Sequence, residues 1–162
     1  MKKLRNVLIA MGLSVSLMPT MVAFASEESY VNRSEEGYSI VVEGTELAVP
    51  TADAALMRAG LEWQWALNVD AGLVGGFDVY AMSGATDIVD SLYVKAEMFF
   101  KNGSVKRNSN SARNSDICET EFYDASTNNL VRENNSFKST HIFEHTGYTK
   151  TTKTVSRNLS DV

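Results

Sequence analysis

The chain contains a single cysteine, Cys118, among its 162 residues. One cysteine cannot close an internal disulfide, so the fold must rest on its hydrophobic core. A reactive thiol or an intermolecular bridge is the functional alternative. We instead expect Cys118 to be buried and free, because it shares the inward face of a predicted strand with Phe122 and free cysteine is among the most buried residue types.

Several motifs that carry chemistry are also missing. The chain has no G-x-S-x-G segment, the turn that holds the nucleophile of many serine hydrolases. The glycines at 72, 75 and 76 have the wrong spacing for a phosphate-binding loop and lack the Lys-Ser or Lys-Thr pair that follows one. Carboxylates are numerous, but no glycosidase pair stands out among them. We therefore predict no catalytic residue, no metal site and no cofactor.

The first 25 residues are typical of a secretory signal peptide. Three basic residues precede an apolar stretch at 7–18, and Ala23 and Ala25 are small residues at the positions that a signal peptidase reads. We expect cleavage before Ser26 and a secreted, extracellular protein with no membrane attachment afterwards. The alternative is an uncleaved anchor, because the uncharged run before the cleavage site is about long enough to cross a bilayer.

Cleavage would change the charge of the protein. The leader carries three of the 15 Lys and Arg residues and none of the 20 Asp and Glu residues, so the remaining 137 residues would have a formal net charge of −8. That length suits one domain. A negative charge of this size disfavours nucleic acid and anionic lipid as partners and suits a cationic one.

Alternating apolar and polar residues dominate 38–162, which predicts a single β-domain. The clearest strands cover 61–70 and 90–101, and clusters of Gly, Asn and Ser separate the strands at intervals of roughly ten residues. We predict an antiparallel β-sandwich or barrel of about eight short strands. At most one short helix, over 52–60, is expected.

Two polar segments are predicted to lie outside the strands. Residues 26–37 are acidic and nearly free of apolar side chains, so we expect a flexible N-terminal segment. Residues 107–116 are polar throughout and predict an exposed loop. The pair Asn102-Gly103, just before this segment, favours a tight hairpin turn. Beyond that turn, either the chain leaves the sheet or a bulge resets the alternation.

Residues 141–145 read H-x-x-E-H, the string of the inverted zinc-protease motif. A helix brings residues four apart within about 6 Å, so that both imidazoles reach one ion. On a strand the same residues lie roughly 13 Å apart, and the neighbouring Thr, Ile and Phe favour a strand. We therefore predict no zinc site, and expect His141 and His145 to flank Phe143 on a half-exposed face.

Aromatic residues supply the best candidates for ligand contact. Trp63 and Trp65 share a face with three aliphatic residues, which indicates core. Tyr93 and Phe99 alternate instead with the apolar face of their strand and lie beside a lysine and a glutamate, which indicates a wet face. We predict Tyr93 and Phe99 as a possible ligand-contact face.

The segments SLYVKAEMFFKNGS and STHIFEHTGYTKTTKTV resemble small secreted proteins of Gram-positive bacteria, mostly of unassigned function. In these a signal peptide precedes an all-β domain with an "LYV…NG" hairpin and a late "S-x-H" strand. In size, export and the Ser/Thr-His strand, the chain is more distantly similar to lactococcin-972-like bacteriocins, small β-sandwich proteins that act on cell-wall synthesis. It is longer and acidic and lacks their glycine- and tryptophan-rich pattern, so no functional residue is carried over.

These observations favour a secreted, non-catalytic module that binds an extracellular ligand: a cell-wall polymer, a glycan or a protein. The resemblance implies one alternative, a bacteriocin-like antagonist of other bacteria. A secreted hydrolase is the least favoured alternative, because no catalytic set is recognisable.

Overall fold

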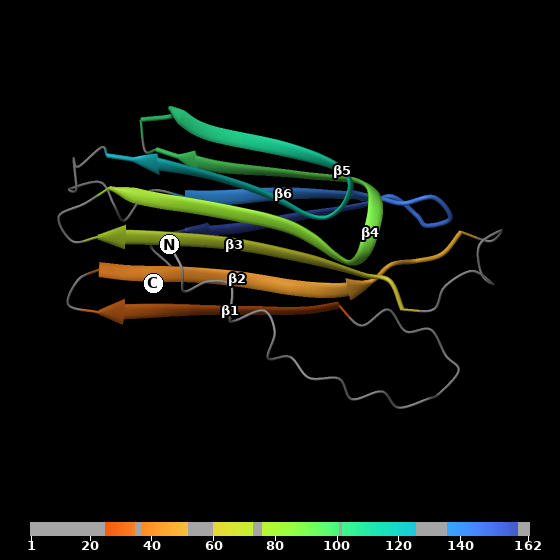
Figure 1. Cartoon of the computed structure of the whole chain (residues 1–162). Coiled ribbons are helices and arrows are strands. Elements are labelled where there is room, and N and C mark those ends of the chain that lie inside the picture. The colour runs from red at the N-terminus through yellow and green to blue at the C-terminus, as the bar shows by residue number, and fades with distance from the viewer. Residues whose placement is uncertain are drawn as a thin grey trace.

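The computed structural model describes residues 25–34, 37–51, 60–72, 76–100, 102–125 and 136–158. Every regular secondary-structure element within these ranges is a β-strand (Figure 1). The seven strands are β1 (Ala25–Ser34), β2 (Gly37–Leu47), β3 (Glu62–Gly72), β4 (Phe77–Phe99), β5 (Val105–Asp124), β6 (Ser136–Glu144) and β7 (Thr151–Asn158). The predicted all-β antiparallel class is confirmed. Residues 52–59 of the helix predicted at 52–60 lie outside the described residues.

The strands form one antiparallel sheet that curls into a half-barrel. Its order is β1-β2-β3-β4-β6-β7, and β5 pairs with the other edge of β4. β4 serves both halves, since 77–85 pairs with β3 and 91–99 pairs with β6. We call β1, β2, β3, the first half of β4 and the second half of β5 the β3 wall. The β6 wall comprises the other halves of β4 and β5 with β6 and β7.

The bend between the walls lies within β4. The pairing with β5 shifts register between Gly84 and Val89, and on β5 Asn114 has a positive φ of 51° near the same point. A bulge of this kind bends a strand and increases its twist. The strand predicted at 90–101 therefore extends back to Phe77 as one bent strand.

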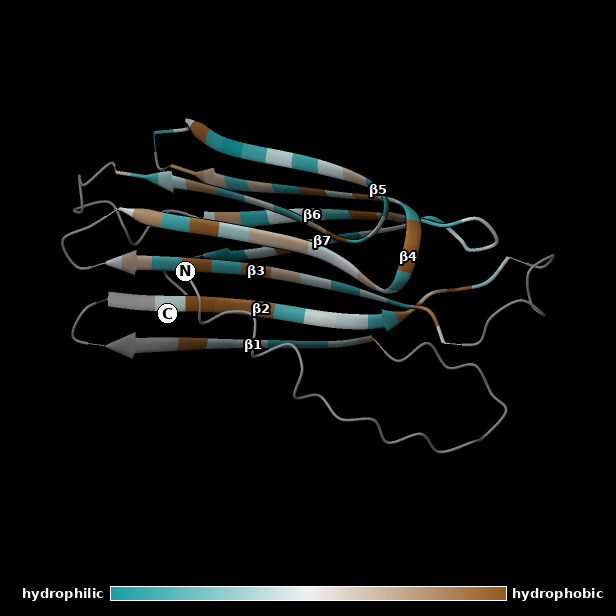
Figure 2. Ribbon diagram, in the orientation of Figure 1, coloured by the Kyte–Doolittle hydropathy of each residue, from teal (hydrophilic) through white to brown (hydrophobic). Residues whose placement is uncertain are grey.

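The loop predicted at 107–116 is wrong, because this segment is the first half of β5. Phe99 lies opposite Val105, so the turn between the strands is five residues long, and Gly103 within it has a φ of 83°. This turn resets the alternation and places Arg107 outward, opposite Glu97. Figure 2 shows hydrophilic residues along most of β5. Main-chain pairing with β4, rather than burial of apolar side chains, holds this polar strand in the sheet.

The predicted flexibility of 26–37 also differs from the structure. Ala25–Ser34 forms β1, which pairs with β2 along its whole length. Every side chain described in β1 is exposed. The strand is therefore ordered by its hydrogen bonds to β2, which composition alone does not reveal. Ala25 and Ser26 of the predicted cleavage site begin this strand, and Ala23 lies outside the described residues.

The core lies between the walls, where the inward faces of their strands meet. Trp63 stacks on Phe143 with ring centroids 5.2 Å apart, and Phe77 lies 5.6 Å from Phe137. All four are at most 2% exposed, and burial of each such side chain contributes about 1.5–3 kcal/mol. Cys118 is free and 3% exposed, which confirms its predicted inward position.

Side chains join the walls along both open edges. On one side β5 folds over itself, and three of its side chains donate to main-chain oxygens farther along the strand: Lys106 to Tyr123, Asn108 to Glu121 and Asn110 to Glu119, at 2.7–2.9 Å. On the other side β7 reaches the β3 wall through two ion pairs, Arg157 with Glu27 and Lys153 with Glu46. Without these contacts, the main-chain carbonyls and charged side chains along the open edges of the curled sheet would face solvent.

We expect the Asn108→Ala/Asn110→Ala double variant to unfold more easily by about 1–2 kcal/mol, because each substitution removes one cross-edge hydrogen bond. Urea unfolding followed by tryptophan fluorescence measures this change. Ser111→Ala, an exposed position on the same strand, is the matched control. Equal stability of all three proteins would show that the asparagines do not stabilise the fold.

Candidate functional site

The sequence predicted a half-exposed position for His141, but the residue lies at the centre of the core. Its side chain is fully buried and faces inward with Phe143. Nδ1 lies 3.0 Å from Ser83 Oγ on β4, and Nε2 lies 2.7 Å from Ser139 Oγ on β6. The prediction failed because the partner that makes burial possible, Ser83, is 58 residues away in sequence.

The hydrogen bonds assign the tautomer of this histidine. Ser83 Oγ donates its only proton to the main-chain oxygen of Tyr93 at 2.9 Å. It must therefore accept from His141, which places the imidazole proton on Nδ1 and leaves Nε2 to accept from Ser139. Burial lowers the pKa of His141 to about 4. The imidazole is thus neutral and enclosed, an arrangement that serves the fold and offers no access to a substrate.

His145 lies beyond the end of β6, on the turn to β7. Its ring stacks on Tyr148, and its Nδ1 lies 3.4 Å from Asp90 Oδ1. Asp90 also accepts hydrogen bonds from the main chain and hydroxyl of Thr146 at 2.6 and 2.7 Å, and these lower the pKa of its carboxyl. This cluster fixes the turn. Because His141 is enclosed in the core, the two histidines of H-x-x-E-H occupy separate environments.

No three His, Cys, Asp or Glu side chains come together to hold a metal ion within the described part of the chain. The same residues include no helix that is long and apolar enough to cross a membrane.

Tyr93 and Phe99 both point outward from the β6 wall, as their strand phase predicts. The register sets Tyr93 in a row across four strands with Ser111, Ile142 and Thr152; the next row holds Ser109, Lys95, Thr140 and Thr154. Tyr93 is half-buried, whereas the serines and the β7 threonines are exposed. The result is a broad surface of hydroxyl groups with one aromatic ring near its middle. Phe99 lies three rows away, at the end of β4.

The same surface carries mostly positive charge. Four of its strand residues are cationic (Lys95, Arg107, Arg113 and Lys138) and two are carboxylates (Glu97 and Glu144). Lys95 pairs with Glu97 at 2.9 Å, and Glu144 pairs with Lys150. Arg107, Arg113 and Lys138 have no ion-pair partner among the described residues. This basic face sits on a chain whose formal net charge is negative.

The outer face of the β3 wall has the opposite character. Seven carboxylates point outward from it: Glu28, Glu43, Glu62, Asp70, Asp78, Glu119 and Glu121. None of the side chains described on this face is a lysine or arginine. The two outer faces of the half-barrel are therefore oppositely charged, an asymmetry that net charge conceals.

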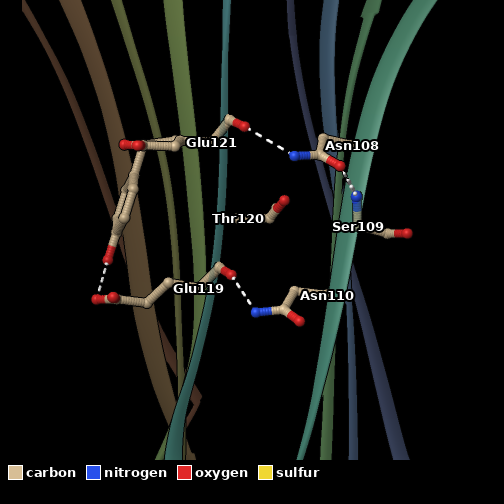
Figure 3. Close-up of a pocket in the computed structure, with 7 residues that line it drawn as sticks. Asn108, Ser109, Asn110, Glu119, Thr120 and Glu121 are labelled. Carbon is tan, nitrogen blue, oxygen red and sulfur yellow. Dashed lines mark hydrogen bonds between the residues drawn. The ribbon is translucent and has the colours of Figure 1, made fainter.

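A groove of about 370 Å³ opens where the acidic face meets the folded edge of β5 (Figure 3). It is lined by Tyr80, Asn108, Ser109, Asn110, Glu119, Thr120 and Glu121. Tyr80 donates a 2.6 Å hydrogen bond to Glu119, and burial together with the two nearby glutamates raises its pKa. This groove was not predicted from the sequence. Its only signal there was the polar, Asn-rich composition of 107–116, which we assigned to a loop.

The buried histidine predicts acid-sensitive stability. Its folded pKa of about 4 is below the ordinary value of 6.5, so the unfolded chain binds a proton that the folded protein excludes between these pH values. Stability is therefore lost as pH falls from 6.5 to 4, by up to roughly 3 kcal/mol. Urea unfolding at pH 7, 6, 5 and 4.5 should show a smaller loss in His141→Gln. The control His145→Gln should keep the wild-type loss; identical profiles for wild type and His141→Gln would contradict the assignment.

Cys118 should react slowly with thiol reagents in the folded protein, because it is buried and burial raises the pKa of its thiol. Labelling followed by mass spectrometry should become fast only after denaturant is added. Rapid labelling of the folded protein, or a disulfide-linked dimer on a non-reducing gel, would refute this.

Comparison with protein families, with curated proteins and with solved structures found no match to the chain. Inference about function therefore rests on the two outer faces and on the groove.

Proposed function

We propose that this protein is a secreted, non-catalytic binding module whose ligand-contact surface is the outer face of the β6 wall around Tyr93. The observation that carries the proposal is the pair of rows through Tyr93 and Lys95, where hydroxyl groups from three neighbouring strands surround one aromatic ring. Sheet proteins commonly bind ligands on such faces and at strand ends, with a rigid scaffold behind them.

The chemistry of the face favours a wall polymer or glycan over a protein. Serine and threonine hydroxyls both donate and accept hydrogen bonds, which suits a ligand rich in hydroxyl groups. The Tyr93 ring offers an apolar surface for a sugar ring together with a polar tip. Arg107 and Arg113 supply planar donors that bind carboxylate or phosphate groups on the ligand. The expected ligand is therefore an extended polymer with hydroxyl and acidic groups.

The two alternatives lack a comparable observation. A bacteriocin-like antagonist is supported by the distant resemblance alone. A hydrolase would need a reactive group exposed at a cleft, but His141 and Cys118 are both buried.

Tyr93→Ala should weaken binding to insoluble Gram-positive cell walls, or to the best ligand of a glycan array, by roughly tenfold, because the ring is the central apolar contact. Tyr30→Ala is the matched control, since Tyr30 is 47% exposed on the β3 wall and should not contribute. Sedimentation assays at several protein concentrations give the affinities.

Circular dichroism must show that both variants keep the fold. Binding that is unchanged in Tyr93→Ala would place the ligand elsewhere. Growth inhibition of related bacteria without any retained binding would favour the antagonist instead.

A further inference from the structure

The turn between β4 and β5 holds the only Asn-Gly pair of the sequence, Asn102-Gly103. Both residues are exposed, and Gly103 has a φ of 83°. Asparagine is a chemically labile residue, because a nitrogen atom that attacks its side-chain carbonyl carbon displaces ammonia. A glycine that follows offers the least obstructed main-chain nitrogen, since it has no Cβ. The turn therefore sets an electrophile and a nucleophile side by side in contact with solvent.

Two hydrogen bonds polarise the side-chain carbonyl of Asn102. Its Oδ1 accepts from the main-chain nitrogen of Ser104 at 2.9 Å and from the Ser104 hydroxyl at 2.6 Å. Attack on the carbonyl carbon moves negative charge onto this oxygen, and donors already aimed at such an oxygen stabilise the transition state. The amide nitrogen Nδ2 makes no hydrogen bond within the described part of the chain. Solvent can therefore protonate this nitrogen as it leaves.

Main-chain hydrogen bonds of the turn oppose the attack. Gly103 N–H donates to the Phe100 oxygen at 2.9 Å, and this bond must open before the Gly103 nitrogen can react. Local opening of an exposed turn requires little free energy, and one hydrogen bond of this kind contributes little net stability. We therefore expect the fold to slow the reaction at Asn102 by no more than about tenfold relative to the unfolded chain.

Asn108 and Asn110 provide a contrast within the same protein. Each is followed by a serine whose main-chain nitrogen donates to the asparagine Oδ1, at 3.0 and 2.9 Å. Each Nδ2 donates to a main-chain oxygen across the edge of the half-barrel at 2.9 Å. These side chains present their oxygen, and not their carbon, to the neighbouring nitrogen, and their amide groups are held at both ends. The fold thus protects both from the reaction that the turn permits.

We propose that Asn102 is a site of spontaneous deamidation through a succinimide ring. The Gly103 nitrogen forms a bond to Cγ of Asn102, the Cγ–Nδ2 bond breaks, and the proton of Gly103 passes through solvent to the departing ammonia. Water then opens the ring at either carbonyl, which gives aspartate or isoaspartate without oxidation or reduction. Either product adds a carboxylate beyond the last residue pair of the basic face. The reaction needs no ligand and is independent of the function proposed above.

The test incubates the purified protein at mildly alkaline pH in water enriched in oxygen-18, with peptide mass spectrometry of each asparagine. Hydrolysis of a succinimide takes up oxygen from water, so the label marks this route. Parallel incubation in guanidinium chloride gives the rates of the unfolded chain. Folding should slow conversion at Asn102 by at most about tenfold, and at Asn108 and Asn110 by at least about a hundredfold.

Variants of the turn test the role of its hydrogen bonds. Ser104→Ala removes one of the two donors and should slow conversion at Asn102 about threefold, whereas Ser104→Thr keeps the hydroxyl and should stay within about twofold of the wild-type rate. Asn102→Gln would have to close a larger ring and should yield no labelled product at this position.

Three results would overturn the proposal. An Asn102 amide that persists in the folded protein, while the unfolded chain loses it, would mean that the turn prevents the reaction. Equal slowing of Asn102, Asn108 and Asn110 by folding would mean that the turn confers no special reactivity. A Ser104→Ala variant that reacts as fast as the wild type would show that the hydrogen bonds to Oδ1 do not promote the attack.

Discussion

The bend of β4 is the constraint on which the half-barrel depends. Ser83 is the last inward residue before the register shift that begins at Gly84. Its hydroxyl donates to the main chain of Tyr93 beyond the bend, and its oxygen accepts from His141 on β6. One buried side chain thus joins the two halves of β4 to each other and to the facing wall. Buried polar chains of this kind strengthen a fold only when every member is satisfied, as the tautomer of His141 allows here.

The bend also separates the charges of the molecule. It places the carboxylates of β1, β2, β3, the first half of β4 and the second half of β5 on one outer face. The cations of the second half of β4, the first half of β5 and β6 lie on the other. Packed sheets lie about 10 Å apart, so with their side chains the outer faces are roughly 20 Å apart. That exceeds the screening length of about 8 Å at physiological salt. Each face therefore presents its own charge to the surroundings, and net charge is a poor guide to either.

Strict alternation of apolar and polar residues was enough to predict the strands that have one apolar face. The strand at 61–70 and the inward Cys118 follow from which neighbours are apolar, and so does the outward direction of Tyr93 and Phe99. Strands without an apolar face gave no such signal. β1 and the first half of β5 are ordered by main-chain pairing and by side chains that bond to distant carbonyls. A composition rule assigns such segments to loops or flexible chain.

The sites depend on contacts between residues far apart in sequence. Tyr80 and Glu119 are 39 residues apart, and Ser83 and His141 are 58 apart. Their meeting follows from the register of β4 with β5 and β6, which the bulge at Gly84 sets. Local pattern does not specify that register shift. For this reason the sequence revealed two histidines and many carboxylates, but not which were enclosed and which lined a groove.

The state of His141 tests the bend most directly. Nitrogen-15 NMR of the imidazole distinguishes its tautomers and follows its protonation. We predict a neutral ring with the proton on Nδ1, unchanged from pH 7 down to about pH 5, because the pKa of His141 is lowered to about 4. A ring protonated at Nε2, or one that titrates near its ordinary pKa of 6.5, would contradict the link between Ser83 and His141 and the bend that it holds.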